Sequence, residues 1–116
     1  MSNKILLHAE GLTVFTLSIY FYFYLKFSWL MFIILLFTPD LAALGYLKNN
    51  HVGSILYNLF HTYTVTVCII IAGLLTDNHI PLMIGLIWTA HIGMDRLFGY
   101  GLKYSTKFQD THLNRV

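Results

Sequence analysis

The sequence predicts an all-α fold, a transmembrane up-and-down four-helix bundle with both termini in the cytoplasm. Hydrophobic residues make up 57% of the 116-residue chain and charged residues only 10%, whereas charged residues form about a quarter of a soluble domain. The mean hydropathy is +0.66. The apolar residues fall into four stretches, residues 5–26, 28–47, 52–75 and 80–102. Each is close to the ~20 residues that cross a ~30 Å hydrocarbon core.

The first stretch, residues 5–26, follows Lys4 as the apolar region of a signal peptide would. His8 and Glu10 interrupt it, and no cleavage motif of small residues follows, so we expect a retained helix. Its far end is the aromatic run Tyr20 to Tyr24. Such runs are typical of the belts that anchor helices at the membrane interface, and we expect an anchor here, not a ligand site.

The remaining stretches are joined by short polar segments, residues 48–51 and 76–79, whose Asn and Asp residues suit turns and helix caps. Pro81 suits the first turn of the fourth helix. Connections this short place consecutive helices antiparallel. Gly85, Thr89 and Gly93 recur at four-residue spacing, which permits close helix contact. We expect one transmembrane domain, residues 1–102, and an interfacial cytoplasmic tail, residues 103–116.

The basic residues predict the orientation. If the amino terminus is cytoplasmic, only Lys26 lies on the outer side, and five basic residues face the cytoplasm: Lys4, Lys48, Lys103, Lys107 and Arg115. The positive-inside rule then gives N-in, C-in, as expected for a multi-pass protein of a bacterial inner membrane. The net charge of +2 is spread over several loops, which argues against a nucleic-acid partner. The expected partners are membrane lipids and a lipid-soluble substrate.

Ionisable side chains interrupt all four apolar stretches, although a charge near the bilayer centre costs at least a few kcal/mol. A rise of ~1.5 Å per residue places all of them in the cytoplasmic half of the bundle: His8, Glu10, Asp40, His61, His91, Asp95 and Arg96. His91 and Asp95 are four residues apart and share a helix face. His8 and Glu10 are two apart, so only one of them can point at the centre. The sequence therefore predicts one polar layer.

Charge balance within this layer favours a bound cation. Three carboxylates against one arginine leave an excess of about two negative charges, which low dielectric does not tolerate without protons or a cation. Two neutral imidazoles with carboxylates suit zinc, iron or manganese. The predicted ligands of this divalent metal are His61, His91, Asp95, Asp40 and Glu10. Glu10 or Asp40 is the candidate general base of a metal-dependent hydrolase or oxidase, with His8, Asn58, Arg96 and His112 in supporting roles.

Other interpretations stay open. Arg96 paired with Asp40 or Glu10, Asp95 orienting His91, and Asn58 tying His61 to backbone carbonyls would form a purely structural network. A proton-coupled small transporter or channel would use Glu10. Haem or a quinone on His61 and His91 is a further alternative, less favoured than a metal ion because of the carboxylates. Arg96 would also suit a phosphate or lipid headgroup. The tail either closes over the site through His112 or lies frayed at the interface.

Several segments together form an unusual pattern: residues 8–11, 39–40, 57–63, 90–96, 99–104 and 111–113. The run from Ala90 to Tyr104 is the most distinctive of these. Through them the chain resembles, over nearly its whole length, a bacterial family of small integral membrane proteins, the domain-of-unknown-function family 4260. The resemblance implies a four-helix membrane protein and provides no catalytic residues to carry over.

Overall fold

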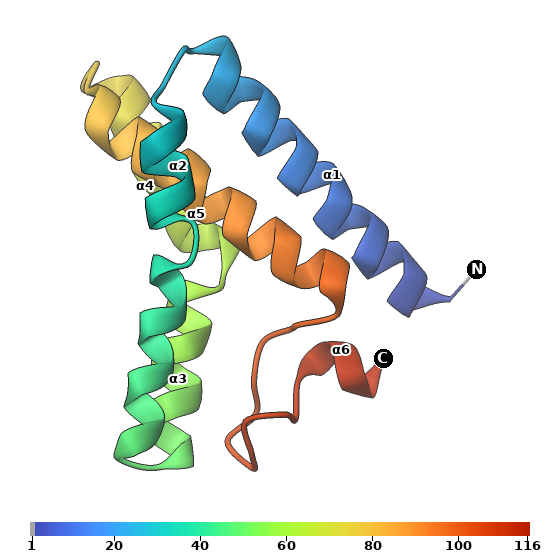
Figure 1. Ribbon diagram of the computed structural model, residues 1–116. Helices are drawn as coiled ribbons and strands as arrows, with labels where there is room; N and C mark the ends of the chain where they lie inside the picture. Colours follow the sequence, from blue (N-terminus) through green and yellow to red (C-terminus); the bar gives the residue numbers. More distant parts are fainter. Residues whose placement is uncertain (1) are drawn as a thin grey trace.

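The computed structural model describes residues 2–116, and these are helical apart from short connections and the tail (Figure 1). In chain order the elements are α1 (Asn3–Tyr24), α2 (Trp29–Leu35), the 3-10 helix η1 (Thr38–Leu47), α3 (Asn50–Phe60), α4 (Tyr63–Leu75), α5 (His79–Phe98) and α6 (His112–Arg115). An isolated bridge between Lys103 and Thr111 is the sole β-type pairing among the described residues. The prediction of an all-α fold is confirmed.

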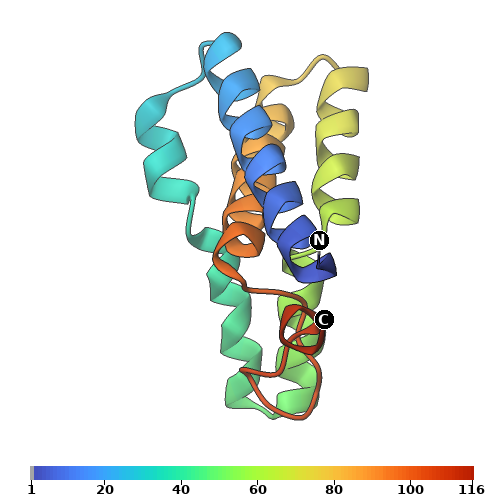
Figure 2. The ribbon, with the colours of Figure 1, turned by 90° about the vertical axis from the view of Figure 1, so that its right-hand side faces the viewer.

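α5 is the central helix, and α1, α2 and α4 pack against it. The α1–α2 and α4–α5 connections lie at one end of the molecule, the top of Figure 2. η1 and α3 form an antiparallel pair that extends toward the opposite end, beside the tail. Consecutive segments therefore alternate in direction, as the short connections predict.

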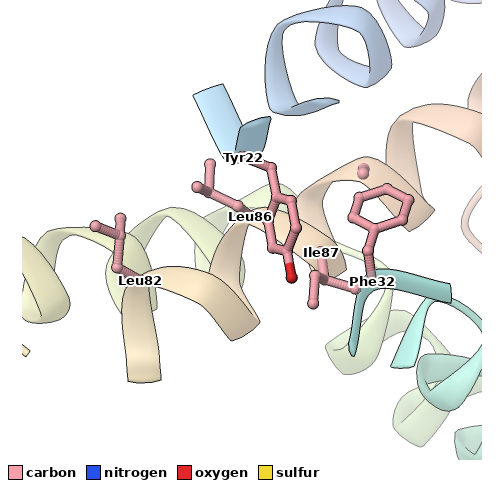
Figure 3. Packing of buried hydrophobic residues seen from close by; sticks show 6 residues of the cluster. Tyr22, Phe32, Leu82, Leu86 and Ile87 are labelled. Atoms are coloured by element: carbon pink, nitrogen blue, oxygen red, sulfur yellow. The ribbon is translucent and has the colours of Figure 1, made fainter. Parts of the chain in front are cut away.

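The largest apolar cluster lies where α1, α2 and α5 meet (Figure 3). Tyr22 and Phe32 pack there against Leu82, Leu86 and Ile87. Most other large apolar side chains are exposed, and they are spread along α1, α2, η1, α3 and α4. Soluble monomers rarely expose contiguous apolar surface on this scale. The small core and apolar exterior are those expected of helices surrounded by lipid.

α1 crosses α5 at close range because both helices have a glycine at the crossing. A Cβ added to Gly11 would lie 2.6 Å from the Cβ of Arg96, and one added to Gly93 would lie 2.7 Å from the backbone nitrogen of Phe15. On another face of α5, a Cβ at Gly85 would lie 2.6 Å from Ile70 of α4. The small-residue pattern of the fourth stretch thus serves two neighbouring helices.

Three helical segments are long and apolar enough to cross a membrane: Asn3–Tyr24, Trp29–Leu47 and Asn50–Leu75. α5, predicted to be the fourth span, is not among them. Polar residues lower the mean hydropathy of α5. They are tolerated because α1, α2 and α4 pack around this central helix. By length and composition the described residues therefore contain three candidate membrane spans where four were predicted.

The second and third of these segments are interrupted, whereas the sequence predicted continuous helices. The second breaks before Pro39, which restricts the residue before it and cannot donate a backbone hydrogen bond. The third breaks at His61 and Thr62, where the backbone leaves helical geometry (ψ 21° and 138°) without a proline or glycine. Both breaks lie beside α5, at the polar residues of the site.

Helix ends follow the expected cap chemistry. Asn49 and Asn78 accept hydrogen bonds from the backbone of α3 and α5, at 2.7 Å and 3.1 Å. α5 ends at Phe98, four residues before the predicted end, because Gly99 takes the left-handed conformation (φ 94°) that closes a helix. This turn directs the tail back under the site.

Candidate metal centre

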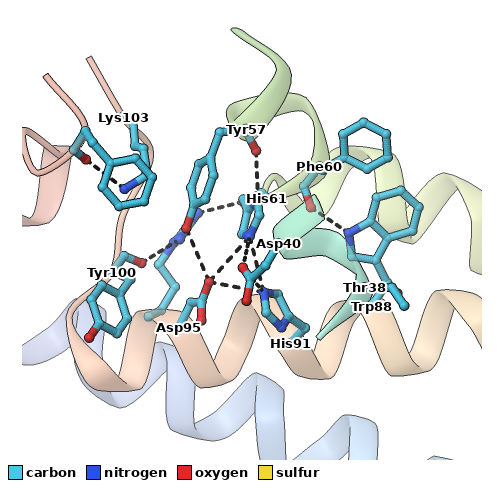
Figure 4. Close-up of polar contacts among 12 residues, drawn as sticks. Thr38, Asp40, Tyr57, Phe60, His61, Trp88, His91, Asp95, Tyr100 and Lys103 are labelled. Atoms are coloured by element: carbon cyan, nitrogen blue, oxygen red, sulfur yellow. Dashed lines mark hydrogen bonds and ion pairs between the residues drawn. The ribbon is translucent and has the colours of Figure 1, made fainter. Parts of the chain in front are cut away.

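The two helix breaks and α5 bring four ionisable side chains together (Figure 4). Asp40 lies in the first turn of η1, just after the break in the second span. His61 directly follows α3, at the break in the third. His91 and Asp95 lie one turn apart on α5. One ligand atom from each residue falls within a group whose members are all within 4.8 Å of one another.

The distances within this group are short and nearly equal. His61 Nε2 lies 3.2 Å from His91 Nε2, 3.2 Å from Asp40 Oδ1 and 3.5 Å from Asp95 Oδ2. His91 Nε2 lies 3.1 Å from Asp40 Oδ1 and 3.3 Å from Asp95 Oδ2. A tetrahedral ion with ligand distances of about 2.0–2.2 Å has ligand–ligand edges of about 3.3–3.6 Å. The five distances are close to those edges, and all four ligand atoms lie within 4.8 Å of one another.

The tautomer of His61 is fixed by the backbone. Its Nδ1 lies 2.8 Å from the carbonyl oxygen of Tyr57, and because a carbonyl only accepts, Nδ1 carries the proton. The lone pair of a neutral His61 is then on Nε2, which faces the other three residues. Metal-binding histidines commonly donate their second nitrogen in this way. The Tyr57 ring stacks on the imidazole, with centroids 3.7 Å apart and planes 5° apart.

The break after α3 leaves backbone carbonyls without helical partners, and side chains satisfy them. The indole nitrogen of Trp88 donates to the carbonyl of Phe60 at 2.5 Å, and its ring stacks on the Phe60 ring (Figure 4). The Arg96 guanidinium donates to the carbonyl of His61 at 2.7 Å. Irregular backbone in a membrane segment needs such partners. The break is therefore a supported part of the fold.

With both imidazoles neutral, hydrogen bonds cannot account for all five contacts of the cluster. A neutral His61 with its proton on Nδ1 has none on Nε2, and a neutral His91 brings at most one proton to its own Nε2. A single cation at the centre would contact all four atoms at once and balance both carboxylates. His91 Nδ1 is buried without a hydrogen-bond partner among the described residues, so the protein itself does not fix the tautomer of His91.

The same distances bear on the haem alternative. A haem iron held by two histidines requires a flat macrocycle between the imidazoles. With 3.2 Å between the two Nε2 atoms, and two carboxylate oxygens converging on them, no macrocycle fits there. The geometry favours a single ion over haem.

The cluster is buried on three sides and open on the fourth. Both imidazoles are fully buried and the Asp95 side chain is 11% exposed, but the Asp40 side chain is 49% exposed. A cavity of about 210 Å³ adjoins the two carboxylates, and it is lined by Asp40, Ala43, Tyr57, Asp95, Tyr100, Lys103 and Phe108. Asp40 is therefore the ligand that a small molecule can reach.

Lys103 places a positive charge in this cavity. Its ammonium donates to the carbonyl of Phe108 at 2.8 Å and lies 3.6 Å and 4.4 Å from the ring centroids of Phe108 and Tyr57. Burial lowers the pKa of Lys103 below its ordinary value. Asn58 fixes the backbone of Lys103 through a pair of hydrogen bonds, at 2.8 Å and 2.6 Å.

The other predicted site residues lie outside the cluster. Glu10, Arg96 and His112 line a second cavity. His8 donates through Nδ1 to the carbonyl of Leu97 at the end of α5, 2.8 Å away. The four clustered residues thus come from the second, third and fourth predicted spans, and none comes from the first.

Two partner assignments of the structural-network interpretation were wrong. Asn58 binds Lys103 rather than tying His61 to backbone carbonyls, a role that falls to Tyr57. Arg96 binds the carbonyls of Tyr100 and His61, at 2.8 Å and 2.7 Å, and not Asp40 or Glu10. The turn at Gly99 brings Tyr100 and Lys103 to these side chains, and the break after α3 leaves the His61 carbonyl free for Arg96. The tail is folded there, since Leu113 is fully buried.

Three further residues shape the site: Tyr57, Trp88 and Lys103. Tyr57 precedes His61 by one helical turn, and that spacing was the available signal. Trp88 carries no sequence signal for its role, because its partner Phe60 lies 28 positions away in the chain. Lys103 was assigned to the interfacial tail, and nothing in its sequence neighbourhood indicates that it turns inward.

The family comparison agrees with the resemblance noted in the sequence. Residues 4–116 match the model described as Domain of unknown function (DUF4260). No curated protein and no solved structure matches the chain. Because the match covers nearly every residue, the chain belongs to the DUF4260 family.

Proposed function

We propose that this protein binds one divalent transition metal ion, zinc by preference, through Asp40, His61, His91 and Asp95, within a membrane. The observation that carries the proposal is the near-equal set of five distances, 3.1–3.5 Å, between the four ligand atoms. Two nitrogens and two oxygens in a tetrahedral arrangement suit zinc, and iron or manganese would fit the same donors with more ligands.

We further propose that the ion serves a hydrolytic enzyme. Catalytic zinc sites have three protein ligands and keep one position accessible. Here three ligand residues are buried, and Asp40, the fourth, is exposed toward a cavity. Asp40 is therefore the ligand that would leave the ion, open a position for water and act as the base. In such a site the metal supplies Lewis acidity toward water and substrate.

The residues divide the chemistry between them. Asp40 accepts the proton of the attacking water, and the water oxygen forms the new bond to the ester carbon or phosphorus. The bond to the leaving oxygen breaks, and Asp40 returns the proton to that oxygen. The Lys103 ammonium holds an anionic part of the substrate, while Tyr57, Tyr100 and Phe108 contact its apolar part. The substrate class is thus an amphipathic ester with an anionic group. Glu10 lies on another cavity, so Asp40 is the base we favour.

Elemental analysis of the purified protein tests the metal site. We expect about one equivalent of zinc per chain, its loss in His91→Ala, and its retention in His51→Ala, a histidine outside the cluster. Absence of any stoichiometric transition metal from the wild type would contradict the proposal. The cluster would then be two imidazolium and two carboxylate groups that share protons, as in the structural or proton-carrying alternatives.

Turnover tests the enzymatic part separately. Metal-loaded wild type and Asp40→Asn are compared on chromogenic carboxylic and phosphoric esters in detergent micelles. We expect the wild type to cleave one of these ester classes and Asp40→Asn to keep metal but lose turnover. Equal turnover by both proteins would exclude Asp40 as the base.

A further inference from the structure

A second polar cavity lies on the other side of the segment that follows α5. Its volume is about 220 Å³, and it is lined by Leu7, Glu10, Gly11, Thr62, Tyr63, Arg96, Leu102 and His112. α1 and the end of α5 form its walls, and the tail covers it. None of the four proposed metal ligands lines it.

Hydrogen-bond donors and a positive charge gather in this cavity. Arg96 is only 7% exposed, and within residues 2–116 its guanidinium has no carboxylate oxygen within 4.0 Å. Its two hydrogen bonds go to neutral carbonyls, so its charge is not balanced by a direct partner. Buried charges ordinarily require such a partner. The cavity next to Arg96 is the place for one.

Two further groups at this cavity are suited to bind an anionic partner of Arg96. The Tyr63 hydroxyl is buried without a hydrogen-bond partner among the described residues. His112 Nδ1 accepts the backbone N–H of Leu102 at 2.8 Å, which leaves the proton of the neutral ring on Nε2 as a donor. A guanidinium, a phenol and an imidazole N–H together resemble the donor sets that bind phosphate.

Glu10 adds the opposite charge at the same cavity. It is exposed, directly precedes Gly11 at the α5 crossing, and is not paired with Arg96. A dianionic phosphate would be repelled by Glu10. A ligand with a phosphodiester on the arginine side and an ammonium group on the glutamate side satisfies both charges at once.

We propose that this cavity binds the headgroup of a zwitterionic phospholipid that carries a phosphodiester and a primary amine. Arg96, Tyr63 and His112 hold the phosphate, and Glu10 receives the ammonium group. The cavity is formed near the beginning of α1 and the end of α5, where a membrane helix meets the headgroup layer. The proposal does not depend on the metal site.

Binding of short-chain lipids to the purified protein in detergent tests this. Dihexanoyl phosphatidylethanolamine is compared with dihexanoyl phosphatidylglycerol by thermophoresis, on the same protein preparation so that metal content is equal for both lipids. We expect tighter binding of the ethanolamine lipid. Equal binding of the two lipids by the wild type would overturn the proposal.

Two conservative variants locate the site. Tyr63→Phe removes a hydroxyl that has no partner, so the melting temperature should not fall, while ethanolamine lipid binds about tenfold more weakly because a hydrogen bond to phosphate is lost. Glu10→Gln weakens the binding of the ethanolamine lipid about threefold and abolishes the preference for this lipid over the glycerol lipid. Asp77→Asn, an exposed acid at the other end of the molecule, serves as the matched control and should bind like the wild type. Unchanged binding in both Tyr63→Phe and Glu10→Gln would also overturn the proposal.

Free phosphoethanolamine identifies the source of the headgroup. If the site takes a membrane lipid, a hundredfold excess of the free compound leaves dihexanoyl phosphatidylethanolamine bound. Displacement at concentrations equal to the lipid would contradict a lipid ligand and assign the cavity to a soluble zwitterion of the same chemistry.

Discussion

The Nε2 atoms of His61 and His91 lie 3.2 Å apart, and both face Asp40 and Asp95. His61 directly follows α3 and His91 lies on α5, 30 positions further along the chain. Because His61 keeps its proton on Nδ1 for the carbonyl of Tyr57, its Nε2 lone pair points into the cluster. Stability of this arrangement therefore requires a proton or a cation between the imidazoles.

The two carboxylates should respond differently to neutralisation. Asp95→Asn replaces a ligand that is 11% exposed, so we expect loss of metal and a lower melting temperature. Asp40→Asn alters a ligand that is 49% exposed, and water can take its place, so metal is retained with weaker affinity. Metal content and melting temperature of the two variants, measured side by side, check this. Equal loss in both would contradict the assignment of Asp40 as the exchangeable ligand.

Trp88→Phe removes the donor for the Phe60 carbonyl at the break in the third span. In hydrocarbon that carbonyl finds no water, so we expect a loss of about 1–3 kcal/mol in unfolding free energy. Denaturant unfolding in micelles measures it. Trp29→Phe, at a tryptophan that is 62% exposed, is the control and should change little. If Trp88→Phe loses no more unfolding free energy than the control, the Phe60 carbonyl must be in contact with water.

Gly11→Ala should separate α1 from α5. The new methyl would lie 2.6 Å from both Arg96 Cβ and the Leu97 backbone nitrogen, and a backbone atom cannot give way. We expect a destabilisation of about 1–3 kcal/mol, read from thermal unfolding in detergent. Ala9→Val, on the exposed surface of the same helix, should have little effect. Stability equal to wild type for Gly11→Ala would mean that the helices do not cross here.

Acidification should weaken the tail through His112. Burial lowers the pKa of its imidazole below the ordinary value of 6.5, so the unfolded chain binds the proton first. Stability therefore falls as pH drops below about 6.5, and it is recovered on raising the pH. Asp110, whose pKa Arg115 holds near 2, stays ionised over this range and adds nothing to the slope.

The measurement is the unfolding free energy between about pH 5 and pH 7.5 for wild type and His112→Asn. Histidines elsewhere in the chain contribute equally to both proteins, so the difference between the two slopes reports His112. We expect the shallower slope in the variant. Parallel slopes would show that His112 does not titrate differently in the folded protein.

Part of this fold could be predicted because membrane insertion imposes simple rules on composition. Apolar stretches and short polar connections predicted the helical fold and the alternating direction of its segments, and Asn49 and Asn78 were recognisable as caps. The break at His61 could not be predicted, since no proline or glycine marks it and its partners, Trp88 and Arg96, are distant in the chain.

The sequence predicted how far along its helix each site residue lies, but not which way its side chain faces. Helical rise correctly grouped Asp40, His61, His91 and Asp95, and the i, i+4 spacing put the last two on one face. Depth also grouped Glu10 with them, although α1 meets α5 on a face that directs Glu10 to the second cavity. Which face of α1 packs inward depends on the glycine contact at Gly11, and one sequence does not specify its partner.

X-ray absorption at the zinc edge of the purified, metal-loaded protein tests the metal centre most directly. The four-residue site predicts one shell of four nitrogen and oxygen neighbours at about 2.0–2.1 Å. Imidazole scattering should be equivalent to two histidines, both in the wild type and in Asp40→Asn, the variant expected to keep its metal. A shell of six oxygens without imidazole scattering would contradict a metal held between His61 and His91.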